Sequence, residues 1–342
     1  MNKDVIIIAE AGVNHNGELQ LAKKLIEEAA LSGADYVKFQ TFKAQNVVTK
    51  SATKAMYQSK NTDDHDDSQF NMLKKLEIPF DWHKKLIAHA SSFGIKFLST
   101  GFDKESIDFL HTLDLDFYKI PSGEITNKPY LKHIASKGIP IVMSTGMANM
   151  IEIEEALEIF FINDFKKQDI TILHCNTEYP TPIEDVNLKA MNSIKEKFNV
   201  NVGYSDHTLG IEVSVAAVAL GATVIEKHFT LDKNMKGPDH KASLNPAELK
   251  ELVKSIRNVQ KSISGNGIKE PSKSEQKNIE IVRKSLYYKN NLSEGHILRP
   301  EDVLSLRPGN GISPMKIDSY IGKKLNQDVI SYSLINKKHF LK

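Results

Sequence analysis

Short runs of apolar and β-branched residues recur along the first 263 residues, and each run ends in polar residues. Between the runs lie longer stretches whose apolar side chains are spaced three and four residues apart, as on one face of a helix. Strands that alternate with helices in this way form parallel sheets. The eight runs are Val5–Gly12, Asp35–Phe42, Ile95–Phe102, Phe117–Glu124, Ile139–Gly146, Ile170–Thr177, Asn201–Thr208 and Ala222–Phe229.

The stretches between the runs predict helices. Leu19–Ser32 is amphipathic, and Leu209–Leu220 is rich in apolar and small residues. Glycines stand where a left-handed helix cap is expected before the next strand, at Gly33, Gly94, Gly138 and Gly221. Eight strand–helix units in roughly 260 residues fit a (β/α)8 barrel better than an open, doubly wound sheet. The expected fold class is therefore α/β, with a barrel over residues 1–263.

Two parts of the chain depart from this rhythm. Residues 43–80 separate the second strand from its helix by more chain than a βα loop needs, and such loops are usually functional covers or disordered. The run Asp63–Asp67 within them includes His65 and could bind a metal, although successive acidic residues are more often solvated. From Ser264 the composition predicts a linker over 264–284. A small, mostly-β module follows over 285–342, and its marginal core suggests that it leans on another surface.

Composition and charge exclude several classes of protein. Hydrophobic residues make up 40% and charged residues 26%, as in an ordinary globular protein. A net charge of +2 gives no sign of binding to nucleic acid or to an anionic membrane. Cys175 is the one cysteine, which fits a reducing compartment. With no apolar run long enough for a signal peptide or a membrane span, the expected location is the cytoplasm.

Two histidines follow the last two predicted strands. Side chains alternate along a strand, so Ser205 and His207 share one face, as do Glu226 and His228. Twenty-one residues separate the histidines, about one strand–helix–strand repeat, so both should project into the barrel mouth, where this fold builds its active sites. An open site with two imidazoles suits a divalent ion such as Mn²⁺, whereas Mg²⁺ is less suited to nitrogen ligands. The alternative is a hydrogen-bonded pair without metal.

Cationic and hydroxyl side chains form a second group at the strand ends. Its members are Lys38, Thr100, Lys119, Ser122 and Ser205. Burying two lysine ammonium groups in a barrel mouth costs free energy unless each has a partner of opposite charge, so a buried anion is expected. A phosphate could pair with both. Backbone N–H groups around Gly123 could meet the same anion. The alternative is an internal salt bridge to Glu10 or Glu226.

Carboxylates complete the predicted site. Glu10, Glu124 and Asp239 could act as acid–base groups or bind sugar hydroxyls, and each could equally be structural. Glu124 lies beside the anion-binding turn and is our candidate acid–base group.

Several motifs, taken together and in order, resemble those of the bacterial sialic acid synthases. They are Ala9–Gly17, Val37–Phe42, Lys119–Glu124, Ser144–Met147, His174–Pro182, Ser205–Thr208, Glu226–Thr230 and Gly237–Asp239. Arg307–Gly311 resembles the C-terminal antifreeze-like (SAF) domain of that family, so the resemblance covers essentially the whole chain. It implies a TIM barrel, followed by a SAF domain over 285–342.

The resemblance also implies a reaction and its ligands. Phosphoenolpyruvate would condense with N-acetylmannosamine, aided by Mn²⁺ or Mg²⁺, to give N-acetylneuraminate and phosphate. Legionaminate synthases carry much the same motifs, so a 2,4-diacetamido-2,4,6-trideoxymannose is the alternative sugar. Another metal-dependent barrel aldolase or a hydrolase would share the histidines but would release no phosphate from phosphoenolpyruvate. A carbohydrate- or ice-binding module would leave the polar strand ends unexplained.

Site residues transfer from the family motif by motif. Those implied to bind metal are His207 and His228. Those implied to hold phosphoenolpyruvate are Lys38, Thr100, Lys119, Ser122 and Ser205, with Asn176 and Thr177 both candidates for the phosphate. Those implied to face the sugar are Glu10, Gln40, Tyr179 and Asp239. Arg307 would reach the partner subunit's site in a domain-swapped homodimer. Thr100 is followed by Gly101, where many members of the family have proline.

Overall fold

The computed structural model describes residues 4–62 and 66–341 of the 342-residue chain. The chain divides into two compact units, one ending at Ser264 and the other beginning at Gly265. Each unit has its own hydrophobic core. His65 and the two aspartates before it, which the sequence offered as weak metal candidates, lie outside the described residues.

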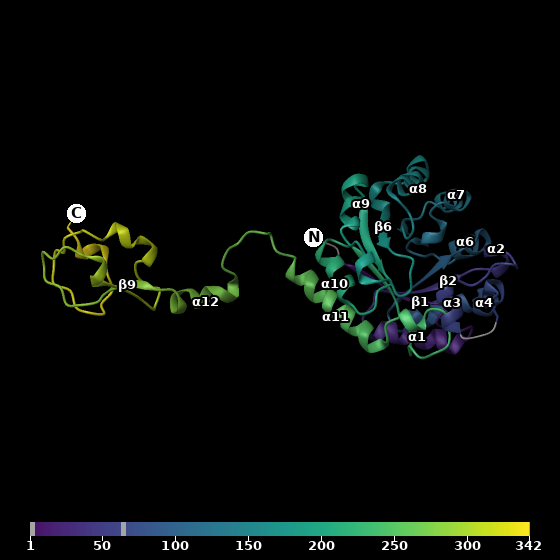
Figure 1. Ribbon diagram of the computed structural model, residues 1–342, viewed down its shortest axis with the longest axis horizontal. Coiled ribbons are helices and arrows are strands. Elements are labelled where there is room, and N and C mark those ends of the chain that lie inside the picture. Colours follow the sequence, from purple (N-terminus) through teal and green to yellow (C-terminus); the bar gives the residue numbers. More distant parts are fainter. Residues whose placement is uncertain (1–3, 63–65, 342) are drawn as a thin grey trace. The chain divides into compact units, whose positions relative to one another are not determined.

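Eight parallel strands form the centre of the first unit, and each lies within its predicted range (Figure 1). They are β1 (Ile6–Gly12), β2 (Tyr36–Thr41), β3 (Lys96–Gly101), β4 (Tyr118–Ile120), β5 (Ile141–Ser144), β6 (Ile170–Cys175), β7 (Asn201–Asp206) and β8 (Val224–His228). Hydrogen bonds join them in the order β3-β2-β1-β8-β7-β6-β5-β4, and β3 also packs against β4. Pairing of the first strand with the last, together with the packing of β3 against β4, brings the sheet round into a near-closed barrel, so the expected (β/α)8 fold is confirmed.

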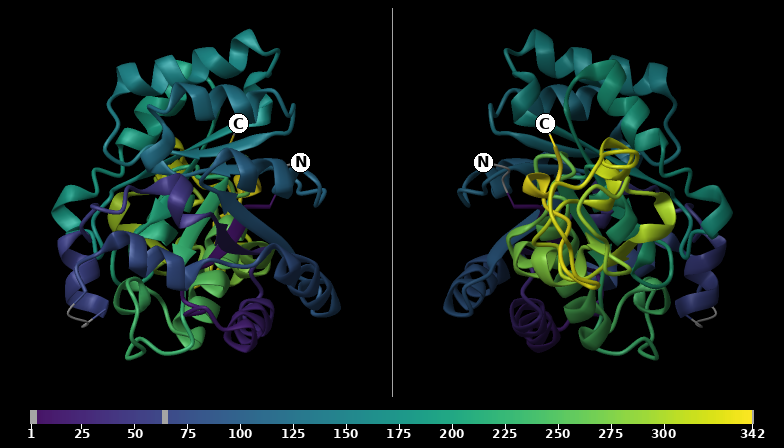
Figure 2. Two further views of the ribbon diagram at one scale, coloured as in Figure 1. Left: turned by 90° about the vertical axis from the view of Figure 1, so that its right-hand side faces the viewer. Right: turned by 90° about the vertical axis from the view of Figure 1, so that its left-hand side faces the viewer.

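Helices surround these strands, as both views in Figure 2 show. They are α1 (Leu19–Leu31), α5 (Phe80–Ser92), α6 (Lys104–His111), α7 (Lys128–Ala135), α8 (Met150–Ile162), α9 (Ala190–Phe198), α10 (Glu212–Ala219) and α11 (Pro246–Ser262). The four predicted glycine caps have φ between +66° and +100°, a region that L side chains rarely adopt. Side chains such as Leu25, Leu86 and Leu249 are fully buried against the sheet, and this burial holds the helices in place.

The long connection between β2 and α5 is largely helical. It contains α2 (Ala44–Val47), α3 (Met56–Thr62) and α4 (Gln69–Leu76). Met72 and Leu76 of α4 are buried against Val13 and Phe42, which follow β1 and β2. Asp66 accepts hydrogen bonds from the Ser68 backbone and from Asn71, so it caps this segment locally. The described residues of this connection therefore form a cover over the strand ends, and not a disordered loop.

The second unit is small. It contains α12 (Lys273–Val282), which lies inside the predicted linker, and an antiparallel pair of strands, β9 (Ser285–Tyr288) and β10 (Val303–Leu306). Its core includes Leu286, and turns and isolated bridges make up much of the rest. Short 3₁₀ turns occur in both units, at Ser122–Glu124, Lys167–Asp169, Ile183–Asp185, His240–Ala242, Pro300–Asp302, Pro314–Ser319 and Lys337–His339. Among the residues described, no helix is both long and apolar enough to cross a bilayer.

Candidate active site

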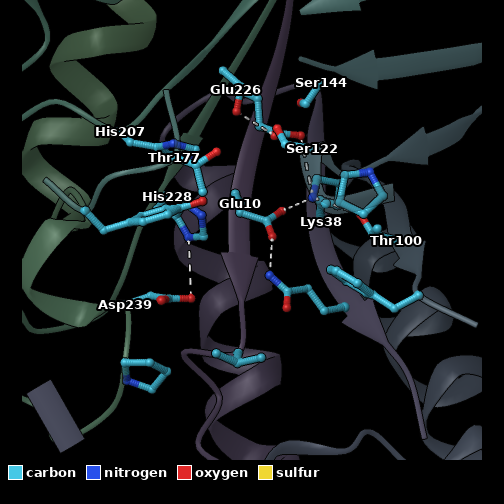
Figure 3. Close-up of a pocket in the computed structure, with 18 of the residues that line it drawn as sticks. Glu10, Lys38, Thr100, Ser122, Ser144, Thr177, His207, Glu226, His228 and Asp239 are labelled. Carbon is cyan, nitrogen blue, oxygen red and sulfur yellow. Dashed lines mark hydrogen bonds and ion pairs between the residues drawn. The ribbon is translucent and has the colours of Figure 1, made fainter. Parts of the chain in front are cut away.

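A cavity opens at the carboxyl ends of the barrel strands, where β1, β2, β7 and β8 contribute side chains (Figure 3). Parallel strands all end at the same rim of a barrel, so residues far apart in sequence meet there. The predicted residues that line it are Glu10, Lys38, Gln40, Thr100, Lys119, Ser122, Thr177, Tyr179, Ser205, His207, His228 and Asp239.

His207 and His228 lie side by side at the ends of β7 and β8. Their ring centroids are 5.5 Å apart. Nδ1 of His207 lies 2.5 Å from the carbonyl oxygen of Asn176, a contact that fixes the ring and leaves Nε2 for another partner. Nδ1 of His228 is buried and makes no hydrogen bond within the described part of the chain. The spacing therefore brings both imidazoles into one mouth, as the strand alternation predicted.

Burial keeps both imidazoles neutral. It lowers the pKa of His207 and lowers that of His228 well below its usual range, and the neighbouring His207 lowers the pKa of His228 further. Neutral imidazole is the form that binds metal ions. No third His, Cys, Asp or Glu completes a metal-binding group among residues 4–62 and 66–341. The pair thus fits an ion that takes its other ligands from water and substrate oxygens.

Asp239 faces the histidines from the loop after β8. Its Oδ2 lies 4.0 Å from Nδ1 of His228. Burial, and then the charge of Glu10, raise the pKa of this carboxyl to about 7. Tyr179 stacks beside His207 with a centroid separation of 4.1 Å, and Tyr57 of α3 stacks on Tyr179 at 5.1 Å. A carboxyl that titrates near neutrality therefore lies beside the imidazole pair.

Two lysines and two glutamates lie together deeper in the barrel. Nζ of Lys38 is 2.5 Å from Oε2 of Glu10 and 3.5 Å from Oε2 of Glu226. Nζ of Lys119 is 3.4 Å from Oε1 of Glu226, which also accepts a hydrogen bond from Ser205 at 2.9 Å. The lysines are thus paired with carboxylates, as in the internal salt-bridge alternative considered above.

The charges of this cluster shift one another's pKa values. Burial alone would raise the pKa of Glu226, but Lys119 and Lys38 hold it at about 2. Burial dominates at Glu10, whose pKa is raised, and at Lys119, whose pKa is lowered. For Lys38 the two carboxylates outweigh burial and raise the pKa. An entering anion would therefore compete with Glu10 and Glu226 for ammonium groups that are already dehydrated.

Hydroxyl groups surround the lysines. Thr100 accepts a hydrogen bond from Lys38 at 3.1 Å, and Ser144 accepts one from Lys119 at 2.7 Å. Ser122 accepts one from the backbone N–H of Gly146 at 2.9 Å. These groups extend the polar floor of the cavity toward β5.

Two predicted site residues of the barrel, Glu124 and Asn176, do not line this cavity. The Glu124 side chain accepts a hydrogen bond from Asn127 at 2.6 Å, because the 3₁₀ turn at Ser122–Glu124 directs it out of the cavity. The Asn176 side chain donates to the carbonyl of Asp185, so Thr177 is the one of that pair found in the cavity. Arg307 is an exposed residue just after β10 in the second unit.

Sequence reasoning left out several lining residues. Ser144 ends the fifth strand, and its position there was a usable signal. Glu226 shares a strand face with His228, but from the sequence it is predicted only as an alternative salt-bridge partner of the lysines. Aromatic and apolar residues of α3 and α4, such as Tyr57 and Met72, also line the cavity. The sequence did not indicate this, because the residues of a helix in a long connection do not show which part of the protein the helix packs on.

Comparison with known proteins identifies relatives over nearly the whole chain. The NeuB family model matches residues 25–269, and the SAF domain model matches residues 283–341. An N,N'-diacetyllegionaminic acid synthase of Campylobacter jejuni is 60% identical over 94% of this chain and 96% of its own. One of Legionella pneumophila is 48% identical over 97% of this chain and 94% of its own.

A solved structure shares the fold as well. The sialic acid synthetase of Leptospira borgpetersenii, crystallised with citrate, superposes with a TM-score of 0.70 at 34% identity. The match covers 81% of this chain and 91% of that one.

Proposed function

This chain belongs to the NeuB family, whose synthases condense phosphoenolpyruvate with sugars, and from that premise we propose that its sugar is 2,4-diacetamido-2,4,6-trideoxymannose. The product would be N,N'-diacetyllegionaminic acid. Identities of 60% and 48% to synthases of that name support this choice over N-acetylmannosamine, which the sequence motifs alone put first. The single observation that carries the reaction is one cavity holding both the imidazole pair and the lysine cluster.

The lysine cluster suits phosphoenolpyruvate. That donor carries a carboxylate and a phosphate, and Lys38 and Lys119 offer two buried ammonium groups beside Thr100, Ser122 and Ser205. Glu10 and Glu226 hold the ammonium groups in place before the anion arrives. Donors fixed in advance and shielded from water stabilise developing charge strongly.

His207 and His228 would hold a divalent cation, with Mn²⁺ favoured and Mg²⁺ as the alternative. When bound, such an ion supplies Lewis-acid polarisation of the sugar's aldehyde oxygen. The contribution of the chain is to keep the two rings neutral through burial and to orient His207 through the Asn176 carbonyl.

The condensation also needs proton transfer. Carbon 3 of phosphoenolpyruvate attacks the aldehyde carbon, and the aldehyde oxygen gains a proton. Water then adds at carbon 2 and loses one proton, which leaves a hydroxyl there. The bond from carbon 2 to the phosphate oxygen breaks, and the hydroxyl gives its remaining proton to the departing phosphate as the keto group forms.

Because Glu124 does not line the cavity, the acid–base role passes to Asp239, a carboxyl that lines the cavity with its Oδ2 4.0 Å from Nδ1 of His228. Glu10 would orient the sugar together with Gln40. The Gln40 side chain donates a hydrogen bond to Oε1 of Glu10 at 3.2 Å.

The second unit would complete the sugar site in trans. In this proposal the enzyme is a domain-swapped homodimer, and Arg307 of each SAF domain reaches the partner subunit's sugar. The exposed position of Arg307 after β10 leaves its guanidinium available for such a contact.

Phosphate-release kinetics with phosphoenolpyruvate and either sugar test this proposal. The diacetamido sugar should give the higher kcat/KM, and His207→Ala should abolish turnover even at saturating Mn²⁺. Retained activity in His207→Ala would remove this residue from the metal site, and a preference for N-acetylmannosamine would overturn the choice of sugar.

A further inference from the structure

One side of the cavity differs from the rest in chemistry. Five side chains there are apolar, and we call this set the apolar wall: Val13, Met72, Leu73, Leu76 and Phe102. Three of the five come from α4, in the long connection between β2 and α5. The active site as derived above gives these residues no function.

The apolar wall lies beyond the strand ends, above the polar floor. In the barrel register Glu226 lies beside Ser205, and two residues further along β8 His228 lies beside Glu10, whose other neighbour in this layer is Lys38. Gln40 pairs with Thr100 one layer higher still. Val13 and Phe102 each follow the last residue of their strands, β1 and β3, and α4 packs on them.

The positions of the charged groups decide which part of the substrate meets the apolar wall. The donor anion would lie between Lys38 and Lys119, and the sugar aldehyde would lie beside it at the histidines. The glutamates and lysines fill the barrel on the inner side of the aldehyde. The remaining carbons of the open-chain sugar would then run outward past Glu10 and Gln40. The carbon farthest from the aldehyde, C6, therefore reaches the layer of the apolar wall.

The apolar wall is rigid enough to discriminate. Met72 and Leu76 are buried in a cluster with Val13 and Phe42, and Phe102 meets Phe42 edge to face at 6.1 Å. Ser68 caps the start of α4 by accepting a hydrogen bond from the Asn71 backbone. Side chains packed in this way have little freedom to move aside for a hydrated hydroxyl group.

We propose that the apolar wall is the specificity determinant for C6, accepting the methyl group of a 6-deoxy sugar and disfavouring a 6-hydroxyl. This inference rests on the proposed condensation and extends it to the substrate class. A hydroxyl packed against the apolar wall loses water there, and the five side chains of the wall offer it no hydrogen bond in return. A methyl group buries apolar surface instead.

The test uses two sugars that differ only at C6, N-acetylmannosamine and 2-acetamido-2,6-dideoxymannose. The wild-type full-length enzyme, assayed by phosphate release, should prefer the 6-deoxy sugar in kcat/KM by roughly 10- to 100-fold. Equal kcat/KM for the two sugars, or a preference for the 6-hydroxy sugar, would overturn this role for the apolar wall. If no amino sugar, including the diacetamido sugar, released phosphate, the proposed condensation itself would fail.

Variants locate the preference on the apolar wall. Leu73→Gln is the first choice because Leu73 is only half-buried, and Met72→Gln is the second. Each should reduce the preference by about 10-fold by improving use of the 6-hydroxy sugar, with the KM for phosphoenolpyruvate unchanged. Met56→Gln is the matched control, because Met56 lies in the same connection but is 92% exposed and does not line the cavity. An unchanged preference in a folded Leu73→Gln enzyme, or an equal shift in Met56→Gln, would contradict the proposal.

Discussion

The two site histidines depend on a buried ion pair behind them. Asp206 precedes His207 and Lys227 precedes His228, and strand alternation turns both away from the cavity. The Lys227 ammonium lies 2.8 Å from Oδ2 of Asp206, and the two residues are 2% and 1% exposed. Asp206 also accepts hydrogen bonds from Thr208 and from Ser214.

Asp206→Ala should therefore lower the free energy of unfolding substantially. Removing one partner of a buried ion pair destabilises a protein by about 3–5 kcal/mol, because the other charge stays buried. At about 2–4 °C per kcal/mol, the melting temperature should fall by about 10 °C. Burial already lowers the pKa of Lys227, and without Asp206 that lysine should lose its proton more easily. Since its folded pKa lies below the unfolded one, the loss of stability should be largest near neutral pH and should shrink as pH rises toward about 10.

Urea unfolding followed by circular dichroism, repeated from pH 7 to 9, measures this effect. Glu154→Ala is the matched control, because it breaks the exposed pair of Glu154 with Lys197 and should cost less than about 1 kcal/mol. Replacing both buried partners, Asp206→Leu with Lys227→Met, should recover most of the stability. If Asp206→Ala cost no more than Glu154→Ala, or its cost did not vary with pH, the reasoning would be refuted.

Three further outcomes are expected. Burial lowers the pKa of His83 to about 4, so the stability it contributes above pH 6.5 should be lost as pH falls toward 4. Between about pH 4 and 6.5 the free energy of unfolding should change less steeply with pH in His83→Gln, by about 1.4 kcal/mol per pH unit, as measured by unfolding at a series of acid pH values. A Cβ on Gly146 would clash with Thr177 Oγ1 and would lie 2.9 Å from Ser122 Oγ. Gly146→Ala should therefore raise the KM for phosphoenolpyruvate by about 10-fold or more, with an unchanged circular dichroism spectrum as control. Arg307→Ala should mainly raise the KM for the sugar, and an unchanged sugar KM would argue against the proposed contact of Arg307 with a partner subunit's sugar.

Much of the barrel was predictable because its signals are local. A strand buried on both faces needs an apolar run, and a helix that turns back into a strand needs a left-handed residue such as Gly33. The same alternation placed His207 and His228 on the inward face, since side-chain direction in a strand depends only on position.

The failures occur where the chain leaves the regular strands. Glu124 follows β4 in a short turn, and its side chain bonds Asn127 outside the cavity. Whether Lys38 pairs with an internal carboxylate could not be read from the sequence, because Glu226 is adjacent to it only through barrel closure.

The positions of the strands along the chain, the inward-facing residues and the kinds of group at the barrel mouth all follow from the order of the amino acids. The folded chain was needed to learn which of those groups touch, how their charges shift one another's pKa values, and that α4 forms one side of the cavity. Backbone periodicity is set by neighbouring residues, whereas distances and dehydration depend on elements that are far apart in sequence and meet when the barrel forms.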